Sequence, residues 1–310
     1  MKDKITVVTS LYKSKIFLDE FIDRILGALK AIECLDFELV FVNDGSPDDS
    51  VEFVIEKQKT ISGIKIIDLS RNFGHHYALQ AGLKYASGDY VFIIDNDLET
   101  SPEVLIDFYA KIKSDSTLDT VYGYQEYRKG ASFERYSGDI FWSIFNKLSP
   151  VDVPKNILTE RIMSRKYIDS LLTMNDSNLF LGGMFYWVGY NQLGIPVKKG
   201  VRLSKSTYTF TKKVNLMIYA ITSFSSKPLE WMFKFGIFVS FFSVTMFVYL
   251  GVKKLFFGDT IQLGWTSIVA LILLVLGILS TFLGLTGIYI SKIYNQVQGR
   301  PNVIIKKIYE

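Results

Sequence analysis

The stretch Tyr90-Val-Phe-Ile-Ile-Asp-Asn-Asp-Leu-Glu99 joins an apolar run directly to a group of acidic side chains. Its first five residues are β-branched or aromatic, which is typical of a buried strand. The acids begin where the apolar run stops, so we expect them at the carboxyl end of that strand. In an open parallel sheet, this end of the strands is where ligands bind. The stretch therefore predicts a sheet with a polar site at one edge.

The same alternation of short apolar runs and amphipathic helical patterns extends over the first 125 residues. Ser46-Pro47-Asp48-Asp49 and Ser101-Pro102-Glu103 each place capping residues and a proline at the start of a helical stretch. We predict an α/β domain with a mostly parallel, doubly wound, Rossmann-like sheet. Its strands are expected at Ile5–Thr9, Glu38–Val42, Ile64–Leu69, Tyr90–Ile94 and Thr120–Tyr122, and its helices near residues 16–31, 49–60, 75–86 and 102–113.

The last quarter of the chain is too apolar for an ordinary soluble domain. Hydrophobic residues make up 49% of the sequence, and the mean hydropathy is +0.21. Phe235–Val252 and Thr260–Ser291 contain no charged residue. Each is long enough to cross a bilayer, which takes about 20 apolar residues. We therefore predict two transmembrane helices within residues 235–291, joined as a hairpin by Lys253–Asp259.

The segment before this hairpin, Leu216–Trp231, is amphipathic and aromatic, and Ser225-Ser226-Lys227-Pro228 interrupts it. The pattern predicts interfacial helices over residues 216–234 that lie on the bilayer. A buried helix of a soluble domain is the alternative. Residues 126–215 are less regular, and we expect them to form a second lobe of one domain that spans residues 1–215.

Charge is distributed unevenly along the chain. Residues 1–176 hold 21 basic and 28 acidic side chains, whereas residues 177–310 hold 14 basic and 3 acidic ones. The basic excess leads into the apolar segments, so a membrane surface or a phosphorylated lipid is the expected anionic partner. Nothing in the sequence resembles a nucleic-acid-binding module, and we expect no nucleic-acid partner.

The basic residues near the two apolar spans also predict their orientation. Six of them lie outside the hairpin and two within it, which places both termini in the cytoplasm. The first residues lack the features of a signal peptide, so we expect residues 1–215 and a tail of residues 292–310 in the cytosol. Cys34, the one cysteine, is expected to be a buried thiol.

The acids after the fourth strand are the candidate catalytic and metal-binding residues. If the chain stays extended there, Asp95, Asp97 and Glu99 converge on one cation. Such oxygen ligands favour Mg²⁺ or Mn²⁺, which then bridges a diphosphate. A solvated turn is the alternative. Asp44, after the second strand, accepts from a base or ribose, or else forms a turn that caps the next helix.

Five motifs in this order resemble the family 2 glycosyltransferases that use polyisoprenyl phosphates, such as dolichyl-phosphate mannose synthase and the bacterial undecaprenyl-phosphate glucosyltransferases. The resemblance covers essentially the whole chain. The motifs are Val40-Phe-Val-Asn-Asp-Gly-Ser46, Leu69-Ser-Arg-Asn-Phe-Gly-His75, Ala86-Ser-Gly-Asp89, Asp95-Asn-Asp-Leu98 and Arg161-Ile-Met-Ser-Arg165.

The resemblance implies a GT-A fold and an inverting, metal-dependent transfer of one sugar to a polyisoprenyl phosphate. The donor would be a nucleotide-diphosphate sugar, most simply a UDP-sugar, and the acceptor undecaprenyl phosphate at the cytosolic face of the cytoplasmic membrane. Such a product would serve modification of cell-envelope glycans. The resemblance implies that Asp44 holds the nucleotide and that Asp95 and Asp97 hold the metal and diphosphate, with Glu99 as a further metal ligand.

The lobe at residues 126–215 would hold the acceptor. Residues that match or lie near the family's acceptor-phosphate positions are Arg128, Arg135, Ser137, Arg202 and Lys205. For Lys205 a place in a general basic face is an equal alternative. Arg71 and His75 either shape the turn after the third strand or contact substrate. The oligomeric state stays open, a homo-oligomer included.

Several positions depart from the family pattern. The usual proline after the first strand is missing in Val8-Thr-Ser-Leu-Tyr12, and the Gly-x-Arg after the fifth strand is Gly123-Tyr-Gln125. The family's aspartate near Arg161 is Thr159 or Glu160, and the segment from Arg202 to Tyr208 alters a family signature. These departures leave a non-enzymatic alternative, a membrane scaffold that binds nucleotide sugars without transferring them.

Overall fold

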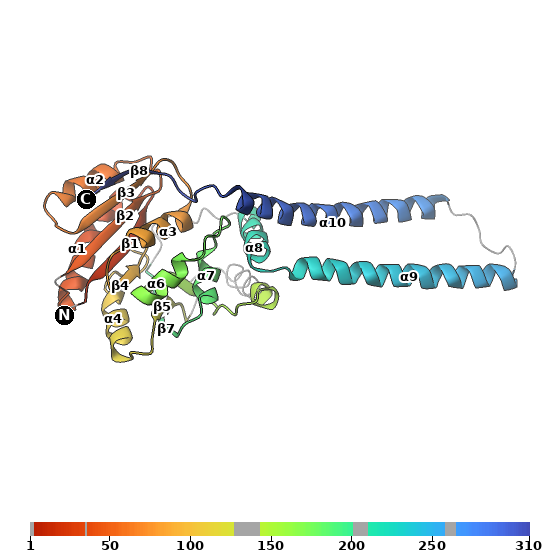
Figure 1. The fold of residues 1–310 in the computed structure, drawn as a ribbon, viewed down its shortest axis with the longest axis horizontal. Helices are drawn as coiled ribbons and strands as arrows, with labels where there is room; N and C mark the ends of the chain where they lie inside the picture. Colours follow the sequence, from red (N-terminus) through yellow and green to blue (C-terminus); the bar gives the residue numbers. More distant parts are fainter. Residues whose placement is uncertain (1–2, 35, 127–142, 201–209, 258–264) are drawn as a thin grey trace.

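A computed structural model shows an α/β domain from which two long helices project on one side (Figure 1). It describes residues 3–34, 36–126, 143–200, 210–257 and 265–310. The strands are β1 (Ile5–Leu11), β2 (Phe37–Asn43), β3 (Ile64–Leu69), β4 (Tyr90–Ile93), β5 (Thr120–Tyr124), β6 (Ile157–Ser164), β7 (Gln192–Pro196) and β8 (Ile305–Tyr309). The helices are α1 (Lys15–Ala31), α2 (Ser50–Gln58), α3 (His75–Tyr85), α4 (Val104–Ser114), α6 (Arg165–Leu172), α7 (Leu181–Trp187), α8 (Phe210–Phe224), α9 (Lys227–Phe257) and α10 (Trp265–Gln298), with a further helical turn at 143–148.

The eight strands form one mixed sheet in the order β7-β5-β6-β4-β1-β2-β3-β8. The central strands β4, β1, β2 and β3 are parallel, and β6 and β8 each pair antiparallel with one of them. The predicted elements of the first 125 residues are confirmed, each boundary lying within about two residues of its expected place. A mostly parallel, doubly wound α/β domain was therefore the right prediction.

Helices cover both faces of this sheet because the central strands are apolar on both sides. Val7 and Phe41 pack with α1 and α4 on one face, and Val8 and Val42 pack with α3, α6 and α7 on the other. α3 lies especially close to the sheet, since a Cβ on its Gly82 would be 2.4 Å from Val8 Cγ1. Cys34 is buried against the first face, as predicted.

Residues 157–196 lie within the expected second lobe, and their strands belong to the same sheet as the first 125 residues. β6 pairs with β4 and β5, and β7 pairs with β5, so this segment extends the main sheet. α8 packs against the edge of the domain in a small apolar cluster around Phe145, Phe180 and Ala220. One face of α8 is thus covered by protein.

The long helices differ from the predicted boundaries. The chain breaks at Ser225-Ser226, as predicted, but α9 then runs without interruption from Lys227 to Phe257. Residues 227–234 are therefore part of the long helix and not of a separate interfacial one. Lys253 and Lys254 are helical too, so the turn of the expected hairpin does not begin at Lys253, and residues 258–264 lie outside the described residues.

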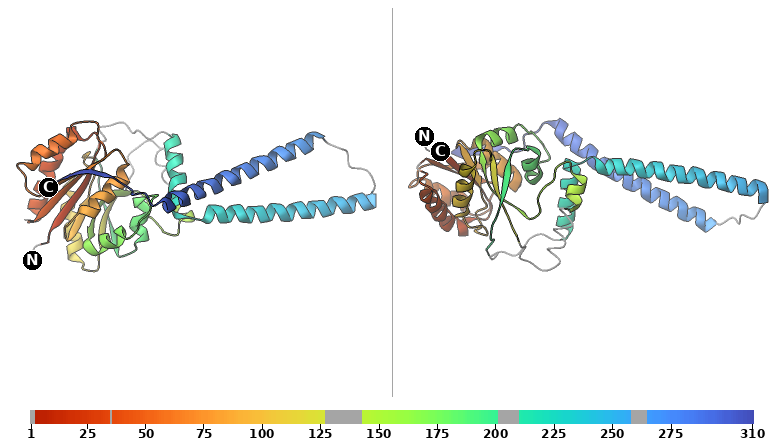
Figure 2. Two further views of the ribbon diagram at one scale, coloured as in Figure 1. Left: turned by 45° about the horizontal axis from the view of Figure 1, so that its top comes forward. Right: turned by 90° about the horizontal axis from the view of Figure 1, so that it is seen from below.

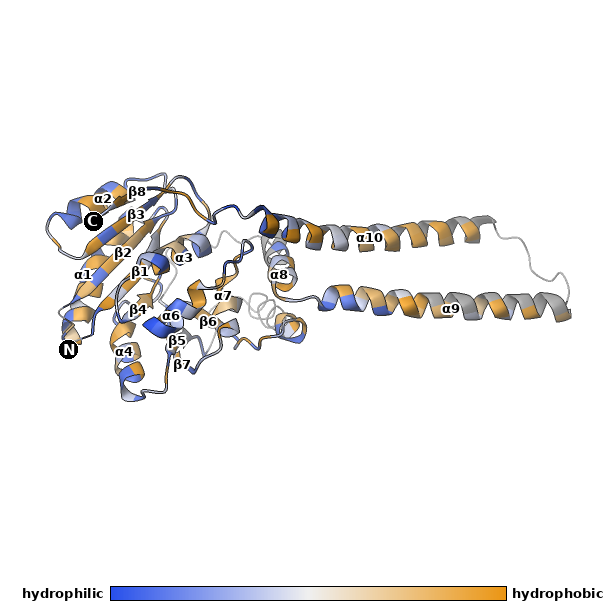
Figure 3. Ribbon diagram, in the orientation of Figure 1, coloured by the Kyte–Doolittle hydropathy of each residue, from blue (hydrophilic) through white to orange (hydrophobic). Residues whose placement is uncertain are grey.

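α10 exposes a long apolar surface. Leu274 and Leu283 are 60% and 73% exposed, and hydrophobic colouring continues along both projecting helices (Figure 3). Within the described part of the chain, one stretch, Leu274–Gln298, is long and apolar enough to cross a membrane, with a mean hydropathy of 1.9. α9 and α10 touch near their base, where the rings of Phe235 and Phe282 meet, and separate toward their far ends (Figure 2).

The chain after α10 returns to the sheet, which the sequence did not predict. β8 pairs antiparallel with β3, so that Ile308 lies opposite Ile67 and Ile305 opposite Leu69. Lys306 Nζ also lies 3.4 Å from Asp68 Oδ2. Residues 292–310 are therefore not a free tail. They include the end of α10 and the strand β8, which pairs with β3 at the edge of the sheet.

A set of neutral hydrogen bonds fixes the C-terminal end of α10 to the domain. We call this set of hydrogen bonds the α10 joint. The Gln296 amide accepts from the Ser177 N–H and donates to the Asn175 carbonyl, at 2.8 and 2.9 Å. The Asn302 amide donates to the Asp176 carbonyl at 2.9 Å. The joint thus connects α10 to the loop between α6 and α7.

Candidate active site

The predicted acids share one edge of the sheet. β1, β2 and β4 are parallel and in register, with Leu11 opposite Asn43 and Val8 opposite Ile93. Asp44 follows β2 and the acidic loop of residues 95–99 follows β4, so both lie at the carboxyl end of these strands. The sequence prediction that these side chains gather at one edge is confirmed.

Asp44 connects two loops at this edge of the sheet. The residue is 3% exposed. Its carboxylate accepts from the backbone N–H groups of Phe73, at 2.7 Å, and Gly74, at 3.0 Å. Gly45 has a φ of 61°, and a Cβ there would lie 2.5 Å from the Asn72 nitrogen. The turn after β2 is therefore pressed against the loop before α3, and only glycine fits this approach.

The capping alternative for Asp44 is wrong. Its carboxylate bonds to residues before α3, and at the start of α2 it is the Asp48 carboxylate that accepts from the Ser50 N–H and hydroxyl. Burial raises the pKa of Asp44, although the two backbone N–H groups oppose that shift. A nucleotide contact by Asp44 stays a prediction.

The surroundings of Asp95 disfavour its negatively charged form. Burial, followed by the negative charge of Asp97, raises its pKa to about 6, against the opposing effect of Lys199. Asn96 anchors the loop, because its amide donates to the Ser10 carbonyl at 2.7 Å. A cation between Asp95 and Asp97 would relieve their repulsion, so these two carboxylates suit a divalent metal.

The expected convergence of three carboxylates is not present. Leu98 has a φ of 58°, so the chain turns there instead of continuing in an extended conformation, and the Glu99 N–H donates to Asp97 Oδ1 at 3.0 Å. The Glu99 carboxylate lies 3.1 Å from Lys199 Nζ. Among the described residues no three His, Cys, Asp or Glu side chains form a group that could hold a metal.

Glu160 on β6 is a neighbour of the site that the sequence marked only as a departure from a motif. It is 1% exposed, and burial together with the charge of Asp95 raises its pKa, while Lys199 opposes the shift. Its position follows from the pairing of β6 with β4, which sets Arg161 opposite Ile93. Only that register would have revealed Glu160 in advance.

Two histidines open α3 beside the acids. His75 lies close to Asp95 and to Ser10 of β1, and burial lowers its pKa. The ring of His76 contacts Phe180 instead, and burial lowers its pKa to about 4. Arg71 lies over the ring of Phe73, which supports the turn-shaping role for that residue.

The residues expected at the acceptor site lie outside the described part of the chain. They are Arg128, Arg135, Ser137, Arg202 and Lys205. The two arginines of the motif at 161–165 have structural contacts. Arg161 is buried with its guanidinium 3.6 Å from the centre of the Phe185 ring, and Arg165 donates to the carbonyls of Ala86 and Gly88.

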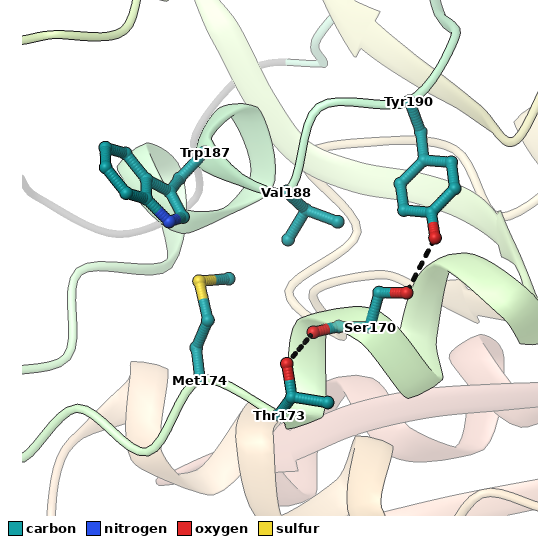
Figure 4. A pocket seen from close by; sticks show the side chains of 6 residues that line it. All are labelled: Ser170, Thr173, Met174, Trp187, Val188 and Tyr190. Atoms are coloured by element: carbon teal, nitrogen blue, oxygen red, sulfur yellow. Dashed lines mark hydrogen bonds between the residues drawn. The ribbon is translucent and has the colours of Figure 1, made fainter.

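A shallow hollow of about 390 Å³ lies elsewhere on the domain (Figure 4). Ser170 of α6 and Tyr190 after α7 share a hydrogen bond of 2.8 Å at one side of it. None of its lining residues belongs to the loops that carry Asp44, Asp95 and Asp97, so it is separate from the acidic site. The lining residues are Ser170, Thr173, Met174, Trp187, Val188 and Tyr190.

Comparison with known families agrees with this combination of fold and acidic edge. Residues 6–172 match the domain described as glycosyl transferase family 2. The chain belongs to this family, and it is an enzyme of the glycosyltransferase class.

Relatives extend the similarity over nearly the full chain. A protein of Mycobacterium tuberculosis named as a putative glycosyltransferase is 35% identical over 306 residues, covering 99% of this chain and 88% of its own length. The bactoprenol glucosyl transferase of Shigella phage SfII is 31% identical over 308 residues and is covered to 98%, as is this chain. An uncharacterised glycosyltransferase of Bacillus subtilis, YkcC, is 34% identical, with 98% of this chain and 94% of its own length covered.

Solved structures support the GT-A fold. Glucosyl-3-phosphoglycerate synthase from Mycobacterium tuberculosis, in complex with Mn²⁺, UDP and glucosyl-3-phosphoglycerate, gives a TM-score of 0.51 at 19% identity. The similarity covers 71% of this chain and 79% of that one. Of the expected fold, the GT-A domain and an apolar C-terminal helix are confirmed, whereas the hairpin of two transmembrane helices stays a prediction.

Proposed function

We propose that this glycosyltransferase moves one sugar from a nucleotide-diphosphate sugar, a UDP-sugar in the simplest case, to a polyisoprenyl phosphate, with inversion at the sugar carbon. The acceptor would be undecaprenyl phosphate at the cytosolic face of the cytoplasmic membrane, and the product would serve cell-envelope glycan modification. Relatives named bactoprenol glucosyl transferase support the acceptor. The donor is supported by a protein of similar fold that was solved with UDP-glucose and Mn²⁺.

One observation carries this proposal: the apolar helix enters the domain at the edge that holds the acids. Ile305, the first residue of β8, lies opposite Leu69, the last residue of β3. α10 therefore reaches the sheet from the carboxyl end of the parallel strands, where Asp44, Asp95 and Asp97 also lie. A lipid phosphate held near α10 would approach the donor from the correct side.

The cofactor of this reaction would be Mg²⁺ or Mn²⁺. Asp95 and Asp97 fit such an ion, because both offer hard oxygen ligands and the pKa of Asp95 is raised by burial and then by the charge of Asp97, a repulsion that a cation would relieve. When bound, the ion would stabilise the negative charge of the leaving nucleoside diphosphate. Glu99, paired with Lys199, would assist only after that ion pair rearranges.

The chain's own contribution would be binding and orientation. A phosphate monoester is already anionic at pH 7, so it needs no strong general base to attack the sugar carbon. Arg128, Arg135, Ser137, Arg202 and Lys205 are proposed to hold the acceptor phosphate. Arg128→Ala or Arg135→Ala should then suppress transfer strongly while nucleotide-sugar binding and membrane association persist. If these variants recover in detergent, the residues belong to a surface that attracts anionic headgroups.

The topology of the proposed enzyme is multi-pass, with the catalytic domain and both termini in the cytosol. β1 and β8 belong to one sheet, so the two ends of the chain must lie on the same side of a membrane. This supports a hairpin of α9 and α10. A cysteine introduced by Gly258→Cys, in a chain whose Cys34 is replaced, should react with an impermeant thiol reagent added to intact cells. Labelling only after lysis would contradict this orientation.

The alternative is a membrane scaffold that binds nucleotide sugars, as motivated by the departures at Gln125 and Arg202. The two functions are separated by incubating the purified full chain with Mg²⁺ or Mn²⁺, undecaprenyl phosphate and a panel of nucleotide sugars. Mass spectrometry should detect one glycolipid product, whose anomeric configuration is opposite to that of the donor. Donor binding without any product would favour the scaffold.

A further inference from the structure

His75, the first residue of α3, lies between β1 and the acidic loop that follows β4. Its Nδ1 is 2.9 Å from Ser10 Oγ, and its Nε2 is 3.5 Å from Asp95 Oδ1. The His75 side chain is 40% exposed and that of Asp95 is 31% exposed. A ligand at the strand ends can therefore reach Asp95 while the imidazole contacts the same carboxylate.

The chemistry of the two partners fixes the direction of these contacts. A carboxylate can only accept a hydrogen bond, whereas a serine hydroxyl can donate or accept. With the proton on Nε2, the ring can direct its N–H toward Asp95, 3.5 Å away, and Nδ1 can then accept from the Ser10 hydroxyl. The ring is thus held from one side so that its N–H is directed at Asp95 from the other.

The surroundings hold both ends of this arrangement in place. The residues just before His75 are fixed by Asp44, which accepts from the Phe73 and Gly74 N–H groups. On the other side, the Asn96 amide donates to the Ser10 carbonyl, which ties the acidic loop to the strand that orients the ring. His75 therefore lies between two segments that other hydrogen bonds hold in place.

His76 offers an internal comparison. It belongs to the same turn of the same helix, and its ring contacts Phe180 at 5.9 Å between ring centres. Among the described residues, His76 forms no hydrogen bond or ion pair with an acid of the site. A general loss of packing at the start of α3 would follow from changing either histidine, but an effect on Asp95 should follow from His75 alone.

We infer that His75 is a positioning residue, whose Nε2–H holds one oxygen of Asp95 and so directs the carboxylate toward the bound divalent cation. This inference rests on the proposed function, since it assigns a role in the same site. Carboxylate ligands of metals are commonly held by a hydrogen-bonding partner behind them, and loss of that partner typically costs about 10–100-fold in metal affinity or activity. Ser10 would orient the ring in turn.

The test uses the full chain in detergent and two independent measurements. The first is the Mn²⁺ concentration that gives half-maximal sugar transfer. The second is Mn²⁺ binding in the presence of UDP, measured by electron paramagnetic resonance without any turnover. The variants are His75→Ala, His75→Asn and His75→Gln, together with Ser10→Ala and the matched control His76→Gln.

His75→Ala and His75→Asn should raise the required Mn²⁺ about 10–100-fold in both measurements. Asparagine is long enough to reach Ser10 but too short to reach Asp95, whereas glutamine can place an N–H near the former Nε2. His75→Gln should therefore restore most of the Mn²⁺ affinity. Ser10→Ala should show a smaller increase of the same kind. His76→Gln should lower thermal stability without changing the Mn²⁺ requirement.

Each contrary result has a distinct meaning. If the unmodified chain transfers sugar and His75→Ala keeps its Mn²⁺ requirement, the positioning role is wrong and the proposed function stands. If glutamine and asparagine behave alike, the effect of His75 is one of packing, which also overturns the inference. A chain that binds Mn²⁺ and UDP but transfers no sugar would refute the proposed function, while the binding measurement still tests His75.

Discussion

The strand-end site and the α10 joint lie at the same edge of the sheet, yet their polar groups are arranged in opposite ways. At the site, burial raises the pKa values of Asp95 and Glu160; the charge of Asp97 raises that of Asp95 further, and the charge of Asp95 raises that of Glu160. At the joint, the amides of Gln296 and Asn302 meet backbone groups in neutral hydrogen bonds. The strand-end site thus contains acids that repel one another, whereas the α10 joint contains neutral groups that are paired in hydrogen bonds.

This difference shows which region is built to receive a ligand. Neutral hydrogen bonds that are already satisfied need nothing further, and they give a fixed connection. Clustered acids with perturbed pKa values lower the stability of the free protein, and they are typical of sites where a ligand or ion relieves the repulsion. Changes in the two regions should therefore affect different measurements.

The largest effect is expected from Asp97→Asn, which keeps the volume of the side chain and removes its charge. Loss of a metal ligand should reduce sugar transfer by about 100-fold or more, while the protein stays folded. Transfer assays with Mg²⁺ and Mn²⁺ check this result. Asp107→Asn, on the exposed side of α4, is the matched control and should keep normal activity. Near-normal transfer by Asp97→Asn at low Mg²⁺ would remove Asp97 from the metal site.

Asp95→Asn should also reduce transfer, though no more than Asp97→Asn does, and at the same time it should stabilise the metal-free protein. The pKa of Asp95 is about 6 in the folded chain and near 3.8 ordinarily, so between pH 4 and 6 the folded state binds more protons than the unfolded state. Stability from this group is therefore present at low pH and lost as pH rises toward 6. The gain for Asp95→Asn above pH 6 should be at most about 3 kcal/mol.

Thermal unfolding of both proteins across pH 4 to 8, with a chelator present, measures this effect. The difference between Asp95→Asn and the parent should grow from pH 4 to pH 6 and then level off. Added Mn²⁺ should stabilise the parent and reverse the order. A pH-independent difference would mean that Asp95 is not strained in the free protein.

Ile308→Pro should weaken the attachment of β8 without touching the acids. Proline removes a backbone N–H and disfavours a place in a strand, so the pairing with Ile67 should suffer. We expect a loss of about 1–3 kcal/mol in unfolding free energy and a lower midpoint in thermal unfolding. Lys306→Ala is the control, since its ion pair with Asp68 is 69% exposed on the lysine side and should contribute little.

The smallest effects should come from the α10 joint. Gln296→Ala and Asn302→Ala each remove neutral hydrogen bonds that are worth about 1 kcal/mol. Stability should fall by about that amount, and the Mn²⁺ requirement for transfer should not change. A large shift in the Mn²⁺ requirement would show that the joint and the site are coupled, and it would blur the distinction between the two regions.

The sequence revealed the elements whose evidence is local and missed those that depend on distant partners. β1 to β4 could be predicted because apolar runs end at turn residues. β8 could not, because Ile305-Lys-Lys-Ile-Tyr309 becomes a strand only through pairing with β3, far away in the chain. The three-acid convergence failed at Leu98, whose positive φ ends the alternation that the prediction assumed.

Glu160 shows the same limit for the site. Its neighbour Arg161 was singled out by a motif, but nothing local indicates that β6 enters beside β4 in antiparallel register. The acids Asp44, Asp95 and Asp97 were found because strand ends in a parallel sheet coincide. The position of a side chain on an inserted antiparallel strand, such as Glu160 on β6, cannot be predicted in this way.

The return of the chain to β3 has a consequence for biosynthesis. The ribosome delivers β8 only after it has made α9 and α10, so β3 is an uncovered edge strand throughout the synthesis of the catalytic domain. An uncovered edge invites pairing with other chains. The sheet can therefore be completed only after the two apolar helices have been synthesised. A nascent chain that fails to insert these helices would keep β3 as an unpaired edge strand, which chaperones and proteases can recognise.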